Sequence, residues 1–351
     1  MGERRLYLDH AATTPVLPAA RLGVADGLEG WANPSSPHRD GRAARAALED
    51  ARARIARALD FDGAVVLTSG ATEAIEIVLR RARTSAAMIS AVEHDAVRRA
   101  VADPLVLPVS AEGIVDLREV GDGTLVAIQA VNNETGVIQS LGEHAAVIRA
   151  AGGLLLADCA QSAGKLPLPD ADFIAVSAHK LGGPPGIGAL LIRDLSTLTP
   201  CGGQEQGYRG GTENLPATLG FAAALEAGTR WMDRARILRA RLDTAIRDSG
   251  GIVVADRSER LPTIASYRMP GVAATTQLIR FDMAGISVSA GSACSSGSLK
   301  PSHVLSAMGW DETAAREVIR ISFGPDTSET DIDRVITQWR TIATSLRAEA
   351  A

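Results

Sequence analysis

The chain has 351 residues, of which 46% are hydrophobic, so it can bury the core of one large domain and one smaller domain. Its net charge of -5 gives no electrostatic basis for binding nucleic acid or an anionic membrane surface. No apolar run reaches the roughly 18 residues of a transmembrane helix, and the N-terminus lacks the apolar centre of a signal peptide. Cys159, Cys201 and Cys294 are too widely spaced for a disulfide framework or a metal site, so we expect a cytoplasmic protein without a metal.

Apolar strands alternate with helices through the first two thirds of the chain. After a short strand at 6–8, apolar residues at helical spacing predict a helix over 41–59. Further strands are expected at 64–68, 87–91, 125–129, 153–157, 172–176 and 189–192. This alternation predicts an α/β fold with a mostly parallel central sheet that is covered by helices.

Polar residues follow nearly every one of these strands. The carboxyl ends of parallel strands meet at one edge of a sheet, which is where open α/β sheets bind ligands. For any single residue, a turn or a helix cap is a sufficient explanation, but it is a weak one for the whole set. We therefore expect one crevice lined by Ser69, His94, Asn133, Asp158, Gln161, Ser177, His179 and Lys180.

The last third of the chain has a different pattern. The segment 201–214 is too rich in glycine to be a helix, and the helical pattern over 216–248 is interrupted near Gly228. We expect a large domain over 14–248 and a smaller α+β domain formed by 1–13 with 249–351. Its expected strands and helices are 252–254, 263–267, 274–284, 286–288, 301–308 and 328–348.

Lys180 stands at the end of the strand expected at 172–176, where a lysine can form a Schiff base with a cofactor aldehyde. A lone loop lysine is more often solvated. Pyridoxal phosphate needs such a lysine and a carboxylate that keeps its ring nitrogen protonated, for which Asp158 is the candidate. Its phosphate needs hydroxyls and the N–H groups of a helix N-terminus, which the segment 69–72 offers.

Two further residues stand out. Small residues surround Cys294 in the segment 289–298, so this cysteine has no apolar neighbours with which to form a core. We expect a reactive thiol on a loop rather than the small buried residue that an isolated cysteine usually is. Arg320 lies in an apolar, strand-like run, which suits either capture of an amino-acid carboxylate or pairing with a structural carboxylate.

In these motifs the chain resembles the cysteine desulfurases, which belong to the class V aminotransferases of pyridoxal-phosphate fold type I. The matching residues span nearly the whole chain in the order of the family. They are residues 7–9 and 11–15, 33–36 with His38, 68–73, 93–94, 132–134 with Gly136, Asp158 with 161–162 and 164–165, Ser177 with 179–180, 202–205, Arg209 with 211–212, 291–294, and Arg320 with Ser322 and Gly324.

The resemblance implies pyridoxal phosphate as the cofactor, L-cysteine as the substrate and L-alanine as the product. Lys180 would carry the cofactor as a Schiff base and move protons, Asp158 would pair with the pyridine nitrogen, and His94 would stack on the ring and take part in proton transfer. Gln161 and Asn133 would contact ring substituents or substrate. The phosphate would be held by Ala71, Thr72, Ser177 and His179, and by Thr212 of the neighbouring subunit of a homodimer.

The resemblance also implies that Asn33 and Arg320 hold the substrate carboxylate. Cys294 would attack the substrate sulfur and carry it as a persulfide to an acceptor protein, such as an iron–sulfur scaffold, or toward thiolation of transfer RNA. Departures from the family pattern occur at Cys201, Gly210 and 325–326. Two alternatives stay open: a selenocysteine lyase or related lyase on the same frame, and a scaffold that binds cofactor and partners without catalysis.

Overall fold

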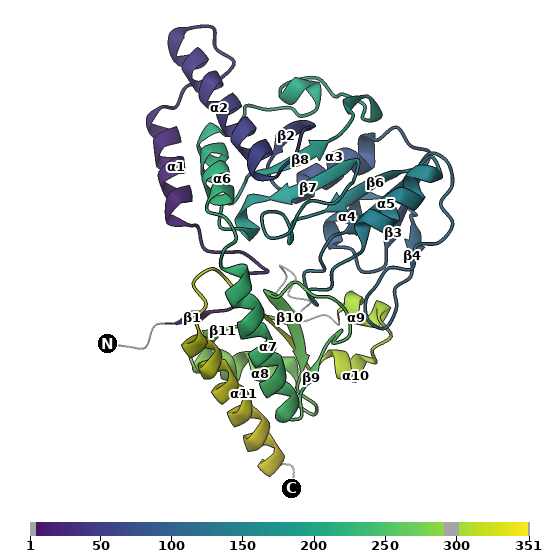
Figure 1. The fold of residues 1–351 in the computed structure, drawn as a ribbon, viewed down its shortest axis with the longest axis vertical. Helices are drawn as coiled ribbons and strands as arrows, with labels where there is room; N and C mark the ends of the chain where they lie inside the picture. Colours follow the sequence, from purple (N-terminus) through teal and green to yellow (C-terminus); the bar gives the residue numbers. More distant parts are fainter. Residues whose placement is uncertain (1–4, 291–301, 350–351) are drawn as a thin grey trace.

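A computed structural model describes residues 5–290 and 302–349 of the chain. It shows a larger unit built around a seven-stranded sheet and a smaller unit that contains the first strand and the last helix (Figure 1). The two units differ in their sheets and in their hydrophobic cores, so each is described in turn.

The sheet of the larger unit has the strand order β2-β8-β7-β6-β5-β3-β4. Neighbouring strands run parallel except for β8, which is antiparallel to both β2 and β7. The mostly parallel sheet is therefore confirmed, although the sequence predicts neither β4 nor the direction of β8. The strands are β2 (Ala64–Thr68), β3 (Ala86–Ser90), β4 (Leu105–Leu107), β5 (Thr124–Gln129), β6 (Leu154–Asp158), β7 (Phe173–Ser177) and β8 (Gly188–Ile192).

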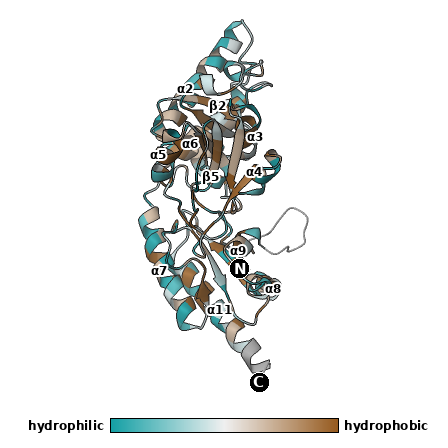
Figure 2. Ribbon diagram, turned by 90° about the vertical axis from the view of Figure 1, so that its right-hand side faces the viewer, coloured by the Kyte–Doolittle hydropathy of each residue, from teal (hydrophilic) through white to brown (hydrophobic). Residues whose placement is uncertain are grey.

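Helices cover both faces of this sheet. On one face, α2 (Arg39–Ala58), α5 (Leu141–Ala150) and α6 (Leu215–Glu226) share a buried cluster with the strands, and α1 (Pro18–Glu29) packs on α6. On the other face, α3 (Ala71–Arg81) and α4 (Asp95–Ala100) pack on the sheet. Figure 2 shows hydrophobic residues concentrated between these layers and hydrophilic ones on the outer sides of the helices, as burial of apolar area requires.

The smaller unit has a three-stranded antiparallel sheet of order β12-β10-β9 and a parallel pair, β1 with β11. Helices α7, α8 and α11 contribute buried side chains to its core, which includes Tyr267 and Trp339. Its elements are β1 (Leu6–Tyr7), α7 (Met232–Asp248), β9 (Ile252–Val253), β10 (Ile264–Arg268), α8 (Ala274–Met283), β11 (Ile286–Ser287), α9 (His303–Ala307), α10 (Glu312–Ala315), β12 (Val318–Ser322) and α11 (Glu329–Glu349).

The packing of α7 bears on where the two units divide. A boundary at residue 248 assigns α7 to the larger unit, yet Leu238, Leu242 and Ile246 of this helix lie in the core of the smaller unit. The break expected near Gly228 is present, since α6 ends at Glu226 and α7 begins at Met232. We therefore propose that the units divide between α6 and α7.

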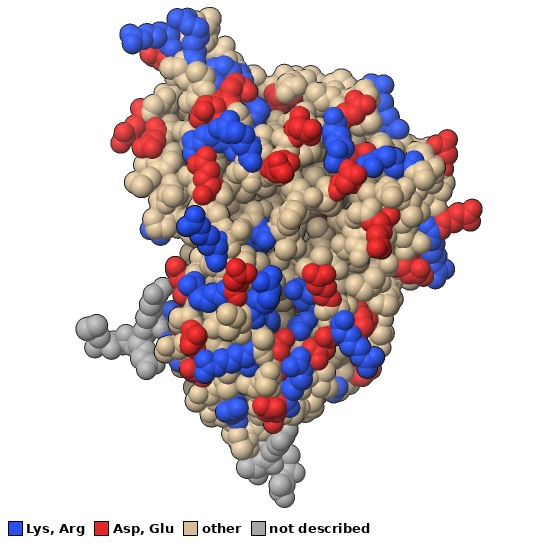
Figure 3. Space-filling model, viewed as in Figure 1, with Lys and Arg blue, Asp and Glu red and all other residues tan. Residues whose placement is uncertain are grey.

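Charged side chains of both signs are interspersed over the face of the molecule shown in Figure 3. Among residues 5–290 and 302–349, no helix is long and apolar enough to cross a membrane.

Candidate active site

A cavity of about 420 Å³ opens at the carboxyl ends of β5, β6 and β7. The last residue of each strand, Gln129, Asp158 and Ser177 respectively, lines it. Parallel strands therefore deliver polar side chains to one edge, as the fold class requires. All eight polar residues expected to share that edge line this cavity, namely Ser69, His94, Asn133, Asp158, Gln161, Ser177, His179 and Lys180. Ala71 and Thr72 line it as well.

One end of the cavity is suited to an anion. Helix α3 begins at Ala71, so the unpaired N–H groups of its first turn and the positive end of its dipole lie at the cavity wall. The hydroxyls of Ser69, Thr72 and Ser177 line the same cavity. Gly188 of β8 lets the chain approach closely here, because a Cβ atom on it would lie 2.7 Å from the Cα of Gly70.

Two side chains are fixed by backbone N–H groups that lie two residues further along the chain. An oxygen of the Asp158 carboxylate accepts a hydrogen bond from the N–H of Ala160 at 2.9 Å, and Nδ1 of His94 accepts one from the N–H of Ala96 at 3.1 Å. The neutral His94 ring therefore carries its proton on Nε2. Burial raises the pKa of Asp158, while the nearby His94 and Lys180 oppose that rise.

Lys180 and Gln161 share one acceptor. The carbonyl oxygen of Ala11 accepts hydrogen bonds from Nζ of Lys180 at 2.6 Å and from Nε2 of Gln161 at 2.8 Å. The other end of the Gln161 amide, Oε1, is buried and has no partner among the described residues. A buried acceptor of this kind is costly unless something bonds it, so it points to a bound group in the cavity.

His179 faces the same region in its neutral form. Its Nδ1 lies 3.1 Å from Oγ1 of Thr13. Burial, together with the charge of neighbouring Lys180, lowers the pKa of His179 to about 4. The ring can therefore offer one N–H to an anion at neutral pH without adding a full charge.

The pKa of Lys180 is lowered to about 8, first by burial and then by the charge of Arg320, with Asp158 and Asp9 opposing the change. Only a neutral amine attacks an aldehyde. With acetaldehyde and borohydride, alkylation of Lys180 in the cofactor-free protein should therefore rise about tenfold per pH unit up to pH 8 and then level off. Mass spectrometry of the Lys180 peptide measures it.

Denatured protein is the control for this pH profile, because there Lys180 regains an ordinary lysine environment. Its alkylation should keep rising to above about pH 10. A folded protein that follows the denatured profile would show that Lys180 is an ordinary lysine.

Lys165 lies next to the active-site cavity, and the sequence pattern predicts no role for it. It lines a second cavity of about 110 Å³ together with Lys180, Trp231 and Phe323. Burial, reinforced by the charge of Lys180, lowers the pKa of Lys165 to about 7. The chain has only three lysines, at 165, 180 and 300. That scarcity is the signal that would have drawn attention to Lys165.

Arg320 projects from β12 of the smaller unit toward this edge of the sheet. Its Nη2 lies 2.7 Å from Oδ1 of Asp9, and its Nη1 donates to the carbonyl oxygen of Asn133 at 3.0 Å. The structure thus contains the pairing with a structural carboxylate that the sequence leaves open. Nε of Arg320 is nevertheless buried without a partner among the described residues, so part of its hydrogen-bonding capacity is still available.

Two other predicted site residues, like Arg320, do not line the large cavity. Oδ1 of Asn33 accepts a hydrogen bond from the N–H of Ser35 at 2.9 Å, and Asn33 does not line the cavity. Thr212 is exposed and also lies outside the cavity. Cys294 falls in 291–301, outside the described residues. Of the other cysteines, Cys159 is buried and Cys201 is exposed.

No group of three or more His, Cys, Asp or Glu side chains within the described part of the chain could hold a metal ion.

Comparison with known proteins gives a consistent result. Residues 6–335 match the family model described as aminotransferase class V. The chain is 37% identical to a protein named cysteine desulfurase from Gluconacetobacter diazotrophicus, over 97% of this chain and 94% of that protein. It is 30% identical to the crystallised NifS-like protein of Rickettsia africae, with a TM-score of 0.87 over 97% and 99% of the two chains. A structure titled "SspA in complex with cysteine" is 28% identical, with a TM-score of 0.77 over 92% and 100%.

Proposed function

The chain belongs to the cysteine desulfurases of the class V aminotransferase family, and from this premise we propose that it binds pyridoxal phosphate in the large cavity and converts L-cysteine to L-alanine. The observation that carries the proposal is the position of Lys180 beside Asp158 in a cavity that also contains the N-terminus of α3. These are the amine, the carboxylate and the anion site that the cofactor requires.

The residues of the cavity fit this cofactor. The N–H groups of Ala71 and Thr72, with Ser177 and His179, would hold the phosphate, and the unpartnered Oε1 of Gln161 would accept a hydrogen bond from a polar group of the cofactor or substrate. Asn133 would contact the ring substituents or the substrate, and His94 would lie against the face of the ring. Thr212 of a neighbouring copy in a homodimer is proposed to add a further contact to the phosphate, and the exposure of the Thr212 side chain permits this.

When bound, pyridoxal phosphate supplies an electron sink for breaking a bond at the α-carbon of the substrate. The carboxylate of Asp158 would hold the proton on the ring nitrogen. Lys180 would hold the cofactor and, once its amine is free, move the proton of the substrate α-carbon, a task that suits an amine whose pKa is about 8. Nε of Arg320, together with Asn33, is proposed to bind the substrate carboxylate.

We assign the sulfur-accepting step to Cys294. Its thiolate would form an S–S bond with the substrate sulfur while the bond from that sulfur to the β-carbon breaks, which leaves a persulfide on Cys294 and alanine after protonation. A sulfur-acceptor protein such as an iron–sulfur scaffold would then receive the sulfur. The unpaired cysteines Cys159 and Cys201 support a reducing, cytoplasmic location.

The test uses purified protein with L-cysteine and a reductant, and follows alanine, sulfide and the visible absorbance of the lysine-bound cofactor. Wild type should make alanine and sulfide in equal amounts. Cys294→Ala should keep the absorbance but lose alanine formation from L-cysteine, because no thiol accepts the sulfur. The matched control is Cys201→Ala, which removes an exposed cysteine outside the large cavity and should stay active.

Two results would contradict the proposal. Absorbance without alanine in wild type would indicate a non-catalytic scaffold. Full sulfide release by Cys294→Ala would remove Cys294 from the reaction. If wild type cleaves L-selenocysteine but not L-cysteine, the selenocysteine lyase alternative gains support.

A further inference from the structure

Strand β2, which leads into the turn at the anion end of the cavity, is the outermost strand of its sheet and pairs only with β8. Two of its backbone groups instead bond to side chains. The carbonyl oxygen of Val65 accepts a hydrogen bond from Nη1 of Arg52 at 2.8 Å, and the N–H of Leu67 donates to Oε2 of Glu205 at 2.7 Å. An ion pair therefore occupies the place of a neighbouring strand along this edge.

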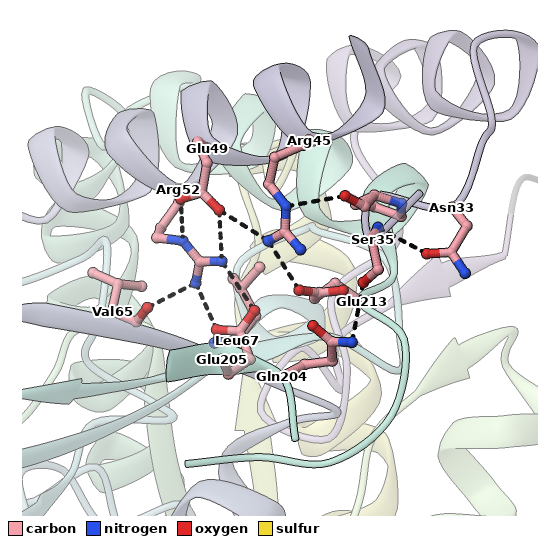
Figure 4. A network of polar contacts seen from close by, with 11 residues as sticks. Asn33, Ser35, Arg45, Glu49, Arg52, Val65, Leu67, Gln204, Glu205 and Glu213 are labelled. Atoms are coloured by element: carbon pink, nitrogen blue, oxygen red, sulfur yellow. Dashed lines mark hydrogen bonds and ion pairs between the residues drawn. The ribbon is translucent and has the colours of Figure 1, made fainter. Parts of the chain in front are cut away.

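The ion pair itself is bidentate and largely buried. Nη1 and Nη2 of Arg52 contact the two carboxylate oxygens of Glu205 at 2.6 and 2.9 Å, and Nε of Arg52 donates to Glu49 at 2.9 Å (Figure 4). The side chain of Glu205 is fully buried and that of Arg52 is 13% exposed. Burial alone would lower the pKa of Arg52, but the hydrogen bonds to Glu205 and Glu49 outweigh it and raise that pKa. A bidentate contact of this kind fixes the relative orientation of the two side chains as well as neutralising their charges.

The backbone of the segment that carries Glu205 is held in an unfavourable conformation. Glu205 and Gln206 have φ angles of 51° and 57°, in the left-handed region that residues other than glycine seldom adopt. Strain of this kind persists only where the surrounding contacts fix it. Figure 4 shows that Arg45 makes a similar contact further along, with Glu213 at 3.1 Å.

The same segment also reaches the turn after β2. Nε of Arg209 donates to Oε1 of Glu73 at 3.1 Å, and Oε2 of Glu73 accepts a hydrogen bond from the N–H of Ser69 at 2.5 Å. Residues 205–209 are thus attached to both sides of the turn 69–72, on the strand before it and on the helix after it. This turn forms the proposed phosphate site.

We propose that Arg52 and Glu205 are positioning residues for the phosphate monoester of the ligand: they fix the outer edge of β2 and so hold the turn 69–72 at the cavity. This inference rests on the proposed function, which places the phosphate at that turn. Neither residue lines the large cavity, so their effect on binding is exerted through the turn.

The test compares the affinities of the cofactor-free protein for pyridoxal phosphate and for pyridoxal, which lacks the phosphate. Arg52→Gln should weaken pyridoxal phosphate binding about tenfold, the scale of loss when the outer support of a binding site is removed, and should leave pyridoxal binding unchanged. Inorganic phosphate should also compete less well with pyridoxal phosphate in the variant. Arg52→Lys, which keeps the charge but loses the bidentate contact, should show a smaller selective loss and serves if Arg52→Gln does not fold.

The matched control is Arg54→Gln. Arg54 lies on the same helix and makes a bidentate ion pair with Glu226 at 2.6 and 2.8 Å, but this pair does not contact β2. Arg54→Gln should change neither the affinity for pyridoxal phosphate nor the affinity for pyridoxal. Equal losses for both ligands in the Arg52 variants, or no loss, would overturn the inference. If wild type binds pyridoxal as tightly as pyridoxal phosphate, it is the proposed phosphate site that fails.

Discussion

Lys180→Ala should reduce the rate of alanine formation from L-cysteine by at least about 10³-fold, because the variant loses both the amine that holds the cofactor and the base that moves the proton. Positioned proton transfer alone contributes about 10²- to 10⁴-fold. Among residues 5–290 and 302–349, no second amine lines the cavity, and Lys165 lines the smaller neighbouring cavity instead. Turnover is measured as alanine, with the visible absorbance of the lysine-bound cofactor recorded in parallel.

Adding a small amine to Lys180→Ala shows whether the rate is lost because the amine is missing or because the variant is misfolded. Methylamine fits the space left by the Lys180 side chain and can act as the missing base, so it should restore part of the rate if the cavity is intact. Undiminished alanine formation by Lys180→Ala without added amine would exclude Lys180 from the reaction.

Asp158→Asn should lower the rate constant of alanine formation by about 10²- to 10³-fold, the range seen when one preorganised electrostatic partner is removed. The substitution keeps the shape of the side chain but removes the negative charge that would hold the proton on the ring nitrogen. The backbone contact from Ala160 can still be accepted by the amide oxygen, so the loop should stay in place. Rates at saturating L-cysteine measure this effect.

Glu93→Gln is the matched control for this variant. Glu93 is also a buried carboxyl, with Oε1 bonded to Ser90 and to the N–H of Gln129. Burial raises the pKa of Glu93 to about 8, so this group is protonated at neutral pH and its replacement by an amide removes no charge. The rate should change little. Equal losses for the Asp158 and Glu93 variants would mean that shape rather than charge matters at both positions.

The pattern of the sequence was sufficient to predict the layers of the larger unit, because apolar runs in parallel strands are long and continuous. It did not predict β4, whose Leu105 and Val106 are exposed and so form no buried run. Nor can period-2 patterning give the direction of a strand, so the reversal of β8 was not predictable from it. The division that we propose between α6 and α7 was equally hidden, because an apolar helical face does not show which core it packs on.

For the site, position after a strand was an effective signal. It predicted that Asp158, His94 and Lys180 lie close together, because parallel strands end at a common edge, and all three line the large cavity. The pairing of Arg320 with Asp9 joins residues far apart in sequence, and no local pattern encodes it. The same holds for Arg52 and Glu205, whose contact depends on how α2 lies along β2.

The scarcity of lysine affects which groups of the molecule gain or lose protons near neutral pH. All but three of the 36 lysine and arginine side chains are arginines, whose guanidinium groups stay charged throughout the physiological range. Near neutral pH, a change in protein charge is therefore concentrated in a few groups, among them Lys165, Lys180 and Glu93 in and beside the cavity. Protons taken up or released on ligand binding, measured by calorimetry in buffers of different ionisation enthalpy, should therefore include contributions from these three groups.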